Sequence, residues 1–359
     1  MKVLLIYAGL SPGGVTADLR NLERGLLSRG LDVAVAGDLA GVRRQARGDV
    51  LVHVFSCLPS ATTFGAMATA KARRLPLVWT PVFHPSRPRS WVGYGPLRIM
   101  EVFDRIAPRA ARLADGVIAA TEAEAAHFSR LGARRVEVIA PAVDKTTARL
   151  SEPERARARA SFGLRDEPTI LLVARPDSAR RKGLPFAGAA FAELRKRLPG
   201  ARLLLVGHQP DDELAGQEGT IAAGWCDAER VAQAYDAADV LMVSSIYEGL
   251  PRAVVEAWSH ELPVAVTDRI ALAPLVRDRA GVVVPSADVS AMAAALEAIV
   301  TDPGRAREYG AAGRDLVEDR FLLDDHVTRT MALYRAVSTK SGSPTAPGAG
   351  SRRGFGSRC

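Results

Sequence analysis

Short apolar runs alternate with segments of helical periodicity along most of the chain. In the first half, the apolar runs predict strands at residues 3–8, 31–36, 50–55, 77–82, 116–120 and 136–140. The amphipathic segments between them predict helices at about 16–29, 39–47, 60–74, 97–113 and 122–131. Thr16 is suited to cap the first helix and Gly30 to end it. Continuous apolar strands separated by helices are typical of a parallel sheet covered on both faces.

A polar, arginine-rich stretch at residues 145–167 interrupts this alternation, which then starts again. The second half predicts strands at 169–174, 202–206, 220–223, 240–244, 263–267 and 282–284. It predicts helices at about 182–198, 228–237, 251–260, 288–301, 303–319 and 324–337. We therefore predict an α/β protein with two Rossmann-like, doubly wound domains, at residues 1–150 and 151–323, with ligands at the carboxyl ends of the strands. Residues 339–359 are rich in Gly, Ser, Pro and Arg, a composition typical of a disordered tail.

The composition agrees with a globular protein of two domains. The chain has 359 residues, 48% of them hydrophobic and 25% charged. The first apolar run is too short for the core of a signal peptide, and no run of about 18 apolar residues occurs. We therefore expect a cytoplasmic protein. The cysteines Cys57, Cys226 and Cys359 have neither metal-binding nor redox spacing.

Positive charge is concentrated in the first half of the chain. Residues 1–150 contain 21 Lys and Arg against 12 Asp and Glu, whereas the remainder contains 27 against 28. Such an excess favours an anionic partner, for example a membrane surface or a phosphorylated lipid. Solvated arginines without a partner are an equally good explanation. No nucleic-acid recognition module is visible, so we expect no nucleic-acid partner.

The candidate chemistry centres on residues 244–257, where a buried strand leads through a serine-rich turn into a helix. Pro251 suits the first position of that helix, whose free amides and dipole can hold a diphosphate. Glu248 lies in the turn and Glu256 about one and a half turns into the helix. A carboxylate can accept hydrogen bonds from two sugar hydroxyls. The alternatives are an exposed turn residue for Glu248 and an i, i+4 ion pair with Arg252 for Glu256.

These residues resemble the family 4 (group 1) glycosyltransferases, which have the GT-B fold of two domains facing a central cleft. Two glutamates separated by seven residues mark that family, and the segment YDAADVLMVSSIYEGLPRAVVEAWSHELPVAVTD matches it almost throughout. The resemblance implies donor contacts from Glu248, Glu256 and the amides of Gly249, Leu250 and Arg252. It departs at Pro251, where the family often has glycine. It also implies that the last helix, residues 324–338, crosses back to the first domain.

The resemblance extends to a basic loop after the first strand of the second domain. Arg175 and Lys182 would offset the charge of a leaving diphosphate, and Arg181 could replace Lys182 because the loop is about two residues longer than usual. The glycine pair Gly13 and Gly14 would face the donor phosphates. A solvated basic loop and a plain tight turn are the respective alternatives.

Two further aromatic candidates follow strand ends. His84 occupies a place where the family often has a histidine that reaches the donor sugar, although a packing histidine is the alternative. Trp225 could stack on the nucleotide base or belong to the core, and Asp227 suits a helix N-cap. His53, inside an apolar run, is expected to be a satisfied histidine of the core or of the cleft edge rather than a catalyst.

The predicted helix at 97–113 carries Arg98, Arg105, Arg109 and Arg112 on one stripe opposite an apolar one. Basic amphipathic helices can lie on anionic membranes. The simpler interpretation is a helix that covers the sheet with its apolar face, kinked at Pro108.

The resemblance implies a retaining hexosyltransferase that uses a UDP- or GDP-type sugar, without a metal or other cofactor. The charge of the first half favours a lipid-linked or carbohydrate acceptor, such as a cell-envelope polysaccharide precursor, and a peripheral position at the inner face of the cell membrane. The alternatives are a nucleotide-sugar epimerase of the same fold and a non-catalytic sugar-nucleotide-binding protein.

Overall fold

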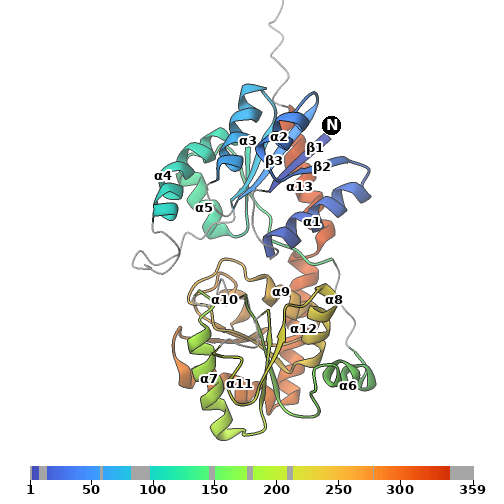
Figure 1. Cartoon of the computed structure of the whole chain (residues 1–359), viewed down its shortest axis with the longest axis vertical. Coiled ribbons are helices and arrows are strands. Elements are labelled where there is room, and N and C mark those ends of the chain that lie inside the picture. Colours follow the sequence, from blue (N-terminus) through green and yellow to red (C-terminus); the bar gives the residue numbers. More distant parts are fainter. Residues whose placement is uncertain are drawn as a thin grey trace, which may run out of the picture.

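A computed structural model of the chain describes residues 2–7, 14–56, 60–81, 98–144, 150–175, 181–207, 213–277 and 279–339. Gly13, Cys57, His84, Cys359 and the predicted disordered tail beyond Thr339 lie outside these residues. The chain forms two α/β units, one above the other in Figure 1. The predicted class, two doubly wound α/β units, is confirmed.

The first unit is built on a parallel sheet in the order β2-β1-β3-β4-β5-β6. Its strands are β1 (Lys2–Tyr7), β2 (Asp32–Ala36), β3 (Val50–Ser56), β4 (Leu77–Pro81), β5 (Gly116–Ala119) and β6 (Val136–Val138). Its helices are α1 (Gly14–Ser28), α2 (Leu39–Gln45), α3 (Ala61–Ala72), α4 (Arg98–Leu113) and α5 (Glu122–Arg130). Every predicted strand is present, with ends that shift by one or two residues.

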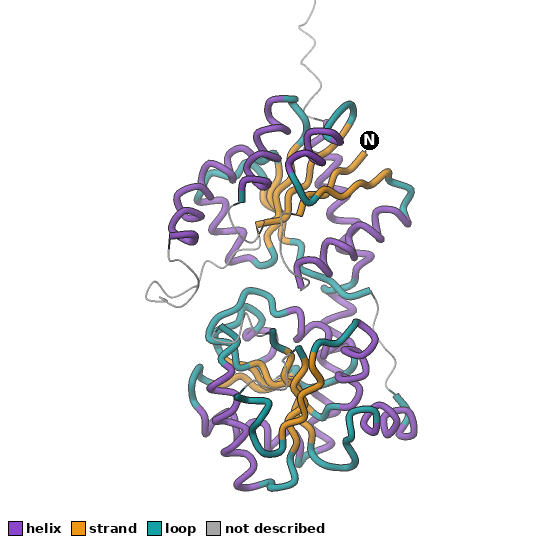
Figure 2. Tube along the Cα trace, in the orientation of Figure 1, coloured by secondary structure: helices purple, strands orange, loops and turns teal. Residues whose placement is uncertain are grey.

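The second unit repeats this plan with the sheet order β12-β11-β10-β7-β8-β9. Its strands are β7 (Thr169–Val173), β8 (Arg202–Val206), β9 (Thr220–Gly224), β10 (Val240–Val243), β11 (Val264–Thr267) and β12 (Gly281–Val284). Its helices are α6 (Glu152–Ala160), α7 (Leu184–Arg197), α8 (Ala228–Ala237), α9 (Arg252–Ser259), α10 (Ala273–Val276), α11 (Val289–Val300) and α12 (Pro303–Arg320). Figure 2 shows helices flanking the strands of both sheets.

Both faces of each sheet are buried, as the apolar strands predict. In β1, Leu4 and Ile6 belong to one apolar cluster, and Val3 and Leu5 belong to the cluster on the opposite face. Successive side chains of a strand point to opposite faces, so a strand without polar residues must be covered on both sides. The same division separates two clusters around the second sheet. Each unit therefore has its own core.

The polar stretch at residues 145–167 contains a helix, α6, which the sequence did not predict. Ser151 and Glu154 form a capping box at its start. The side chains of Arg155 and Arg159 bond to Asp239 in the turn before β10. Ion pairs to another part of the chain hold this helix. Its sequence therefore lacks the apolar periodicity from which a helix is predicted.

Two predicted helix starts differ from the structure. Helix α1 begins at Gly14, so Thr16 lies inside it rather than capping it. Helix α9 begins at Arg252, one residue later than expected, so Pro251 is its N-cap rather than its first residue. Gly30, with φ of 77°, does end the first helix region, and Asp227 caps α8 through the amide of Arg230.

The last helix, α13 (Leu323–Ser338), follows the second unit in sequence but packs on the first. The chain crosses between the units twice, and the two crossing segments lie side by side. The backbone of Val143, in the first crossing, bonds to Phe321 and Leu323, in the second, at 2.9 and 2.8 Å. In Figure 1 α13, coloured red, runs behind α1. Its Tyr334 hydroxyl lies 2.7 Å from Nδ1 of His53, whose Nε2 lies 2.7 Å from the Thr80 hydroxyl. His53 is therefore a satisfied core residue, as expected.

Replacing Tyr334 tests how strongly this buried bond holds α13. Tyr334→Phe leaves Nδ1 of His53 without its partner in the core, and we expect a loss of about 1–3 kcal/mol in the free energy of unfolding. Tyr309→Phe is the matched control, because the Tyr309 hydroxyl accepts a bond from Arg305 near the surface. Denaturant unfolding of both variants measures the difference, and equal losses would contradict the role given to Tyr334.

Candidate active site

The strand ends of β7 and β10 bring two loops together in the second unit. The two strands are neighbours, with Val240 opposite Ile170. Ser244, directly after β10, donates through its hydroxyl to the carbonyl of Lys182 at 2.6 Å. Gly183 lies so close to Ser244 that a Cβ would meet its carbonyl oxygen at 2.1 Å, and its φ is +66°. Only glycine fits there, so the backbone contact fixes where Lys182 projects.

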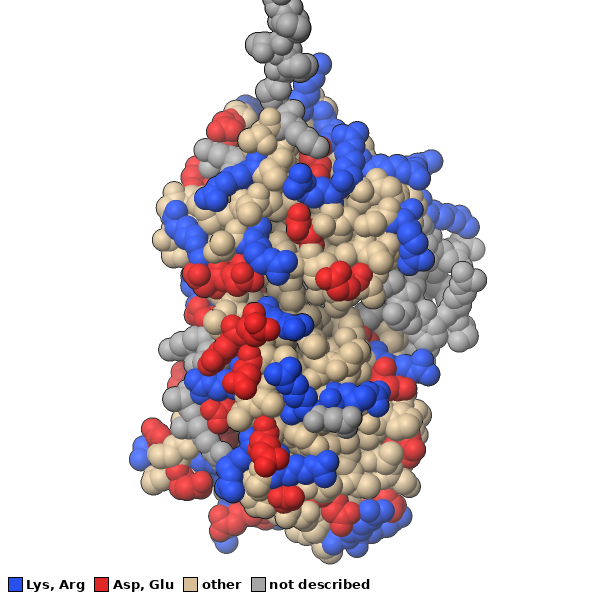
Figure 3. All heavy atoms as spheres, turned by 180° about the vertical axis from the view of Figure 1, so that it is seen from behind, with Lys and Arg blue, Asp and Glu red and all other residues tan. Residues whose placement is uncertain are grey.

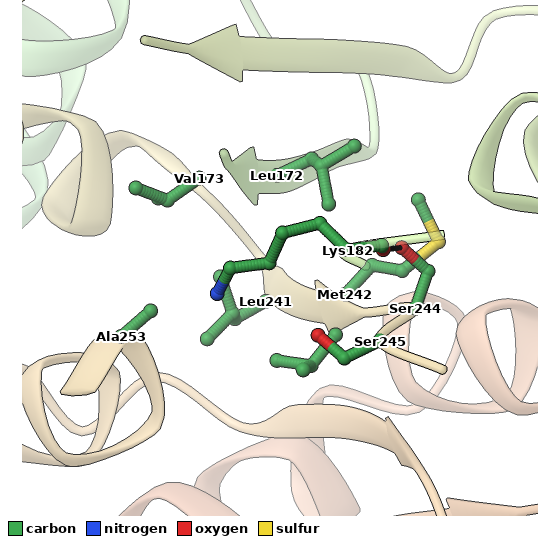
Figure 4. A pocket seen from close by; sticks show the side chains of 9 residues that line it. Leu172, Val173, Lys182, Leu241, Met242, Ser244, Ser245 and Ala253 are labelled. Carbon is green, nitrogen blue, oxygen red and sulfur yellow. Dashed lines mark hydrogen bonds between the residues drawn. The ribbon is translucent and has the colours of Figure 1, made fainter. Parts of the chain in front are cut away.

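A pocket opens at this junction, and Figure 4 shows the Lys182 side chain extended across it. Leu172, Leu241 and Met242 supply apolar walls, while Ser244 and Ser245 supply hydroxyls. Ala253 of α9 also lines it. The site therefore lies at the carboxyl ends of the strands, where doubly wound folds bind ligands.

Glu248 is the centre of the polar contacts at this place. Its Oε1 accepts from Nη1 of Arg181 at 2.6 Å and lies 2.8 Å from Nζ of Lys182. Its Oε2 accepts from the Ser245 hydroxyl at 2.9 Å. The side chain is only 11% exposed, so Glu248 is not an exposed turn residue. Both cations of the basic loop, not one in place of the other, contact the glutamate.

The charge state of Glu248 follows from these neighbours. Burial alone would raise the pKa of the carboxyl group, but the charges of Lys182 and Arg181 and their hydrogen bonds lower that pKa to about 2. Glu248 is thus ionised at every pH near neutrality. Two cations and one carboxylate leave a net positive charge, which suits an anionic ligand.

The turn that carries Glu248 is held by backbone bonds. The amide of Glu248 donates to the carbonyl of Arg269 at 3.0 Å, and the carbonyl of Gly249 accepts from Ala271 at 2.9 Å. Helix α9 starts three residues later, and the first amides of a helix have no acceptor within it. Leu250 lies between the turn and the helix, partly buried. The structure therefore places the carboxylate of Glu248, the turn at Gly249 and Leu250, and the start of α9 next to one another along the chain, as predicted.

Glu256 lies on α9 with both carboxylate oxygens engaged. Oε1 accepts from Nε of Arg252 at 2.7 Å, and Oε2 accepts from the hydroxyl of Tyr235 at 2.8 Å. The i, i+4 pair weighed as the alternative for Glu256 is thus formed. A carboxylate oxygen has a second lone pair, so these bonds orient Glu256 without blocking a ligand.

Arg252 also reaches the first unit. Its Nη1 donates to the carboxylate of Asp18 in α1 and lies 3.3 Å from the carbonyl oxygen of Ala142. Burial raises the pKa of Asp18 to about 6, although the charge of Arg252 opposes this. Helices α1 and α9 each follow the carboxyl end of a strand, so this contact places those edges of the two sheets toward one another. Sequence reasoning missed Asp18, because no local pattern marks a contact over 234 positions.

The remaining predicted site residues that the structure describes are Arg175, Gly14 and Trp225. Arg175 follows the end of β7 by two residues and is partly buried. Gly14 is the first residue of α1. Trp225 follows β9 at the sheet edge and is 58% exposed, so it is not a core residue. Its stacking on a base stays a prediction.

The first unit contributes a buried carboxyl group that the sequence did not single out. Glu124, at the carboxyl end of β5, accepts from the amide of Ala120 at 2.8 Å, and the Thr121 hydroxyl caps the same helix. Burial raises the pKa of Glu124 to about 7 despite that hydrogen bond. The local signal was present, since Thr121 and Glu124 form the spacing of a capping box.

This raised pKa predicts a pH-dependent stability. The folded protein holds a proton on Glu124 that the unfolded chain releases near pH 4.3, so the free energy of unfolding falls as pH rises from there through about 7. Glu124→Gln keeps an accepting oxygen without the charge. We expect it to be more stable than wild type by about 1–3 kcal/mol at pH 8 and equal at pH 5. Denaturant unfolding at both pH values measures this; a difference that does not change with pH would contradict it.

Two family models match the chain. The model described as "Glycosyl transferases group 1" matches residues 167–302, which contain Glu248 and Glu256, and "Glycosyltransferase Family 4" matches residues 36–147. The chain belongs to the family 4 (group 1) glycosyltransferases. The resemblance seen in the sequence is confirmed.

Individual relatives agree with this family. A D-inositol 3-phosphate glycosyltransferase of Mycobacteroides abscessus is 28% identical over 69% of this chain and 57% of its own length. A GDP-mannose-dependent phosphatidylinositol monomannoside mannosyltransferase of Mycolicibacterium smegmatis is 30% identical over 52% of each chain. The chain therefore spans little more than half the length of these relatives.

Solved structures share the fold. Sucrose-phosphate synthase of Thermosynechococcus elongatus has a TM-score of 0.76 at 20% identity and covers 95% of this chain and 100% of its own. The Anabaena protein HepE in complex with UDP and glucose has a TM-score of 0.75 at 18% identity, covering 94% and 100%. The predicted GT-B fold is confirmed.

Helix α4 and the surface around it bear on the membrane hypothesis. Arg105, Arg109 and Arg112 of α4 are exposed, and so is Leu113. Figure 3 shows basic and acidic side chains intermixed on this face of both units, with Lys and Arg most prominent toward the top of the upper unit. Among the described residues, no helix is both long and apolar enough to span a bilayer.

Proposed function

We propose that the chain is a retaining glycosyltransferase that moves a hexose from a UDP- or GDP-type sugar to an acceptor hydroxyl. One observation carries the proposal: Arg181 and Lys182 converge on Glu248 beside the start of α9. Phosphate oxygens suit these cations and the first amides of the helix. Glu248, released from its cations, then has lone pairs for the hydroxyls of the sugar.

The chemistry follows from charge and position. As the bond between the sugar and the diphosphate breaks, negative charge grows on the leaving oxygen, and Arg181 and Lys182 offset that charge. The diphosphate remains on the face from which it leaves and takes the proton of the acceptor hydroxyl, so the new bond forms on that face and configuration is retained. Closure of the two units excludes water and limits hydrolysis of the donor.

The donor and acceptor classes are supported by the relatives. HepE has been solved with UDP-glucose, and the mycobacterial mannosyltransferase is named for GDP-mannose and a phosphatidylinositol acceptor. The excess of Lys and Arg in the first 150 residues suits a phosphorylated or lipid-linked acceptor. We propose an acceptor of that class, such as a precursor of a cell-envelope polysaccharide or glycolipid.

Purified protein with UDP-glucose or GDP-mannose tests the reaction itself. We expect release of UDP or GDP that accelerates when lipid-linked acceptors are added, with an α-linked product by NMR. We also expect the rate to persist in EDTA, since Arg181 and Lys182 supply the positive charge. A β-linked product would refute retention, and loss of the rate in EDTA would refute transfer without a metal.

Glu248→Gln separates chemistry from anion binding. It removes the negative charge that Arg181 and Lys182 now contact, so UDP or GDP should bind at least as tightly as to wild type. The turnover rate should fall by about 100-fold or more, because the carboxylate no longer acts on the sugar. Glu193→Gln, which alters an exposed ion pair with Lys196, is the control and should leave both measurements unchanged. Equal turnover in Glu248→Gln and wild type would end the proposal.

We also propose that the first unit contacts anionic membrane through α4. Vesicles containing anionic lipid should sediment the protein, and neutral vesicles should not. Replacing Arg105, Arg109 and Arg112 together by Gln should abolish this. The control replaces Arg130, Arg134 and Arg135, which are equally exposed in the same unit, and changes the net charge by the same amount. Equal partitioning into both kinds of vesicle would remove the proposal.

A further inference from the structure

Arg252 makes polar contacts on both sides of the boundary between the units. It is the first residue of α9 in the second unit. Its Nη1 donates to Asp18 in α1 of the first unit and to the carbonyl of Ala142, in the segment that leads from the first unit. Its Nε donates to Glu256 at 2.7 Å. One guanidinium group thus bonds to both units and to the chain between them.

This cluster is costly to bury, so stability alone does not explain it. The side chains of Arg252 and Asp18 are 18% and 20% exposed. An ion pair removed from water gains little over apolar packing, because desolvation offsets most of the attraction. The rise of the Asp18 pKa shows the same penalty. A buried pair of this kind does, however, require one specific geometry of its partners.

The contact lies beside the connection between the units. Ala142 precedes Val143, whose backbone bonds to Phe321 and Leu323 where the chain passes between the units a second time. Points near the connecting segments move least when two domains rotate about a hinge. The Asp18–Arg252 pair can therefore remain formed while the far side of the cleft opens and closes.

The orientation of Glu256 depends on this pair. One carboxylate oxygen is held by Arg252 and the other by the hydroxyl of Tyr235, which is protonated at neutral pH like any tyrosine and whose pKa burial raises further. Tyr235 is fixed by packing, its ring stacked on His260 at 5.5 Å between centroids. Arg252 is long and has many rotamers, so its own position needs the contacts to Asp18 and Ala142.

We propose that Arg252 is a positioning residue that holds Glu256 for the hydroxyls of the donor only while α1 of the first unit supplies Asp18. The inference rests on the proposed function, and it makes donor binding by the second unit depend on Asp18, a residue of the first unit. Arginine is required, because its planar group donates in several directions at once, whereas a lysine is a single charged point.

Asp18→Asn tests this coupling, with Asp144→Asn as the matched control. Asp144 lies two residues beyond Ala142 and forms an exposed ion pair at 3.3 Å with Arg24 of the same helix α1. UDP and GDP are titrated by calorimetry, and kcat and KM are measured with UDP-glucose and GDP-mannose. We expect Asp18→Asn to raise Kd and the donor KM about tenfold, with kcat within about twofold of wild type. Asp144→Asn should match wild type.

A second variant keeps the test independent of how well Asp18→Asn folds. Arg252→Lys retains the positive charge and should raise the donor KM to the same extent. The double variant should be no worse than Arg252→Lys alone, because both changes break one chain of contacts. The melting temperatures of all variants are also compared. A purely structural role would lower the melting temperature without raising KM selectively over kcat.

The outcomes separate this inference from the proposed function. If wild type binds a nucleotide and Asp18→Asn behaves like Asp144→Asn, the positioning role of Arg252 is refuted and the proposed function stands. Additive effects in the double variant would refute it equally. If wild type binds neither nucleotide and releases none from either sugar donor, the proposed function falls and this inference falls with it.

Discussion

The carboxylate of Glu248 shares a nearly closed space with the charges of Arg181 and Lys182. Without the cations, a carboxylate with so little exposure would take up a proton; without the carboxylate, the two cations would repel one another. The cluster is therefore stable only as a set, and it keeps an excess of one positive charge. An anion of suitable shape can replace the carboxylate at the cations. The surrounding structure, including the glycine at 183 and the hydroxyl of Ser244, serves to hold these groups at one strand end.

Each unit gathers its loops at one edge of a parallel sheet. Parallel strands bring their carboxyl ends to one edge of a sheet, so loops far apart in sequence meet there. The contact between α1 and α9 turns the two edges toward each other, and α13 ties the second unit's chain end to the first unit's core. In the proposed function, this arrangement presents a donor held by one unit to an acceptor on the other. This geometry agrees with the glycosyltransferase family to which the chain belongs.

Some details of the structure could not be read from the sequence, for identifiable physical reasons. Helix α6 has no apolar stripe, because arginines bonded to Asp239 hold it in place of a hydrophobic face. Thr16 looked like a cap, but the helix extends two residues further, to a glycine. Glu256 was weighed as either a ligand contact or an intrahelical pair, and the structure shows that pair formed. Its two oxygens still leave lone pairs, so the pair and the ligand contact are compatible.

The sequence by itself determined the alternation of strands and helices, the division into two units, and the segment around Glu248 and Glu256. These are local properties: apolar runs must be buried, and spacing along one helix follows from its pitch. Only the tertiary structure decided that Arg181 and Lys182 both contact Glu248 and that Asp18 pairs with Arg252. Such contacts join positions up to 299 residues apart, as between Arg29 and Thr328. They depend on how the sheets and units are placed in space, and no periodicity along the chain encodes that placement.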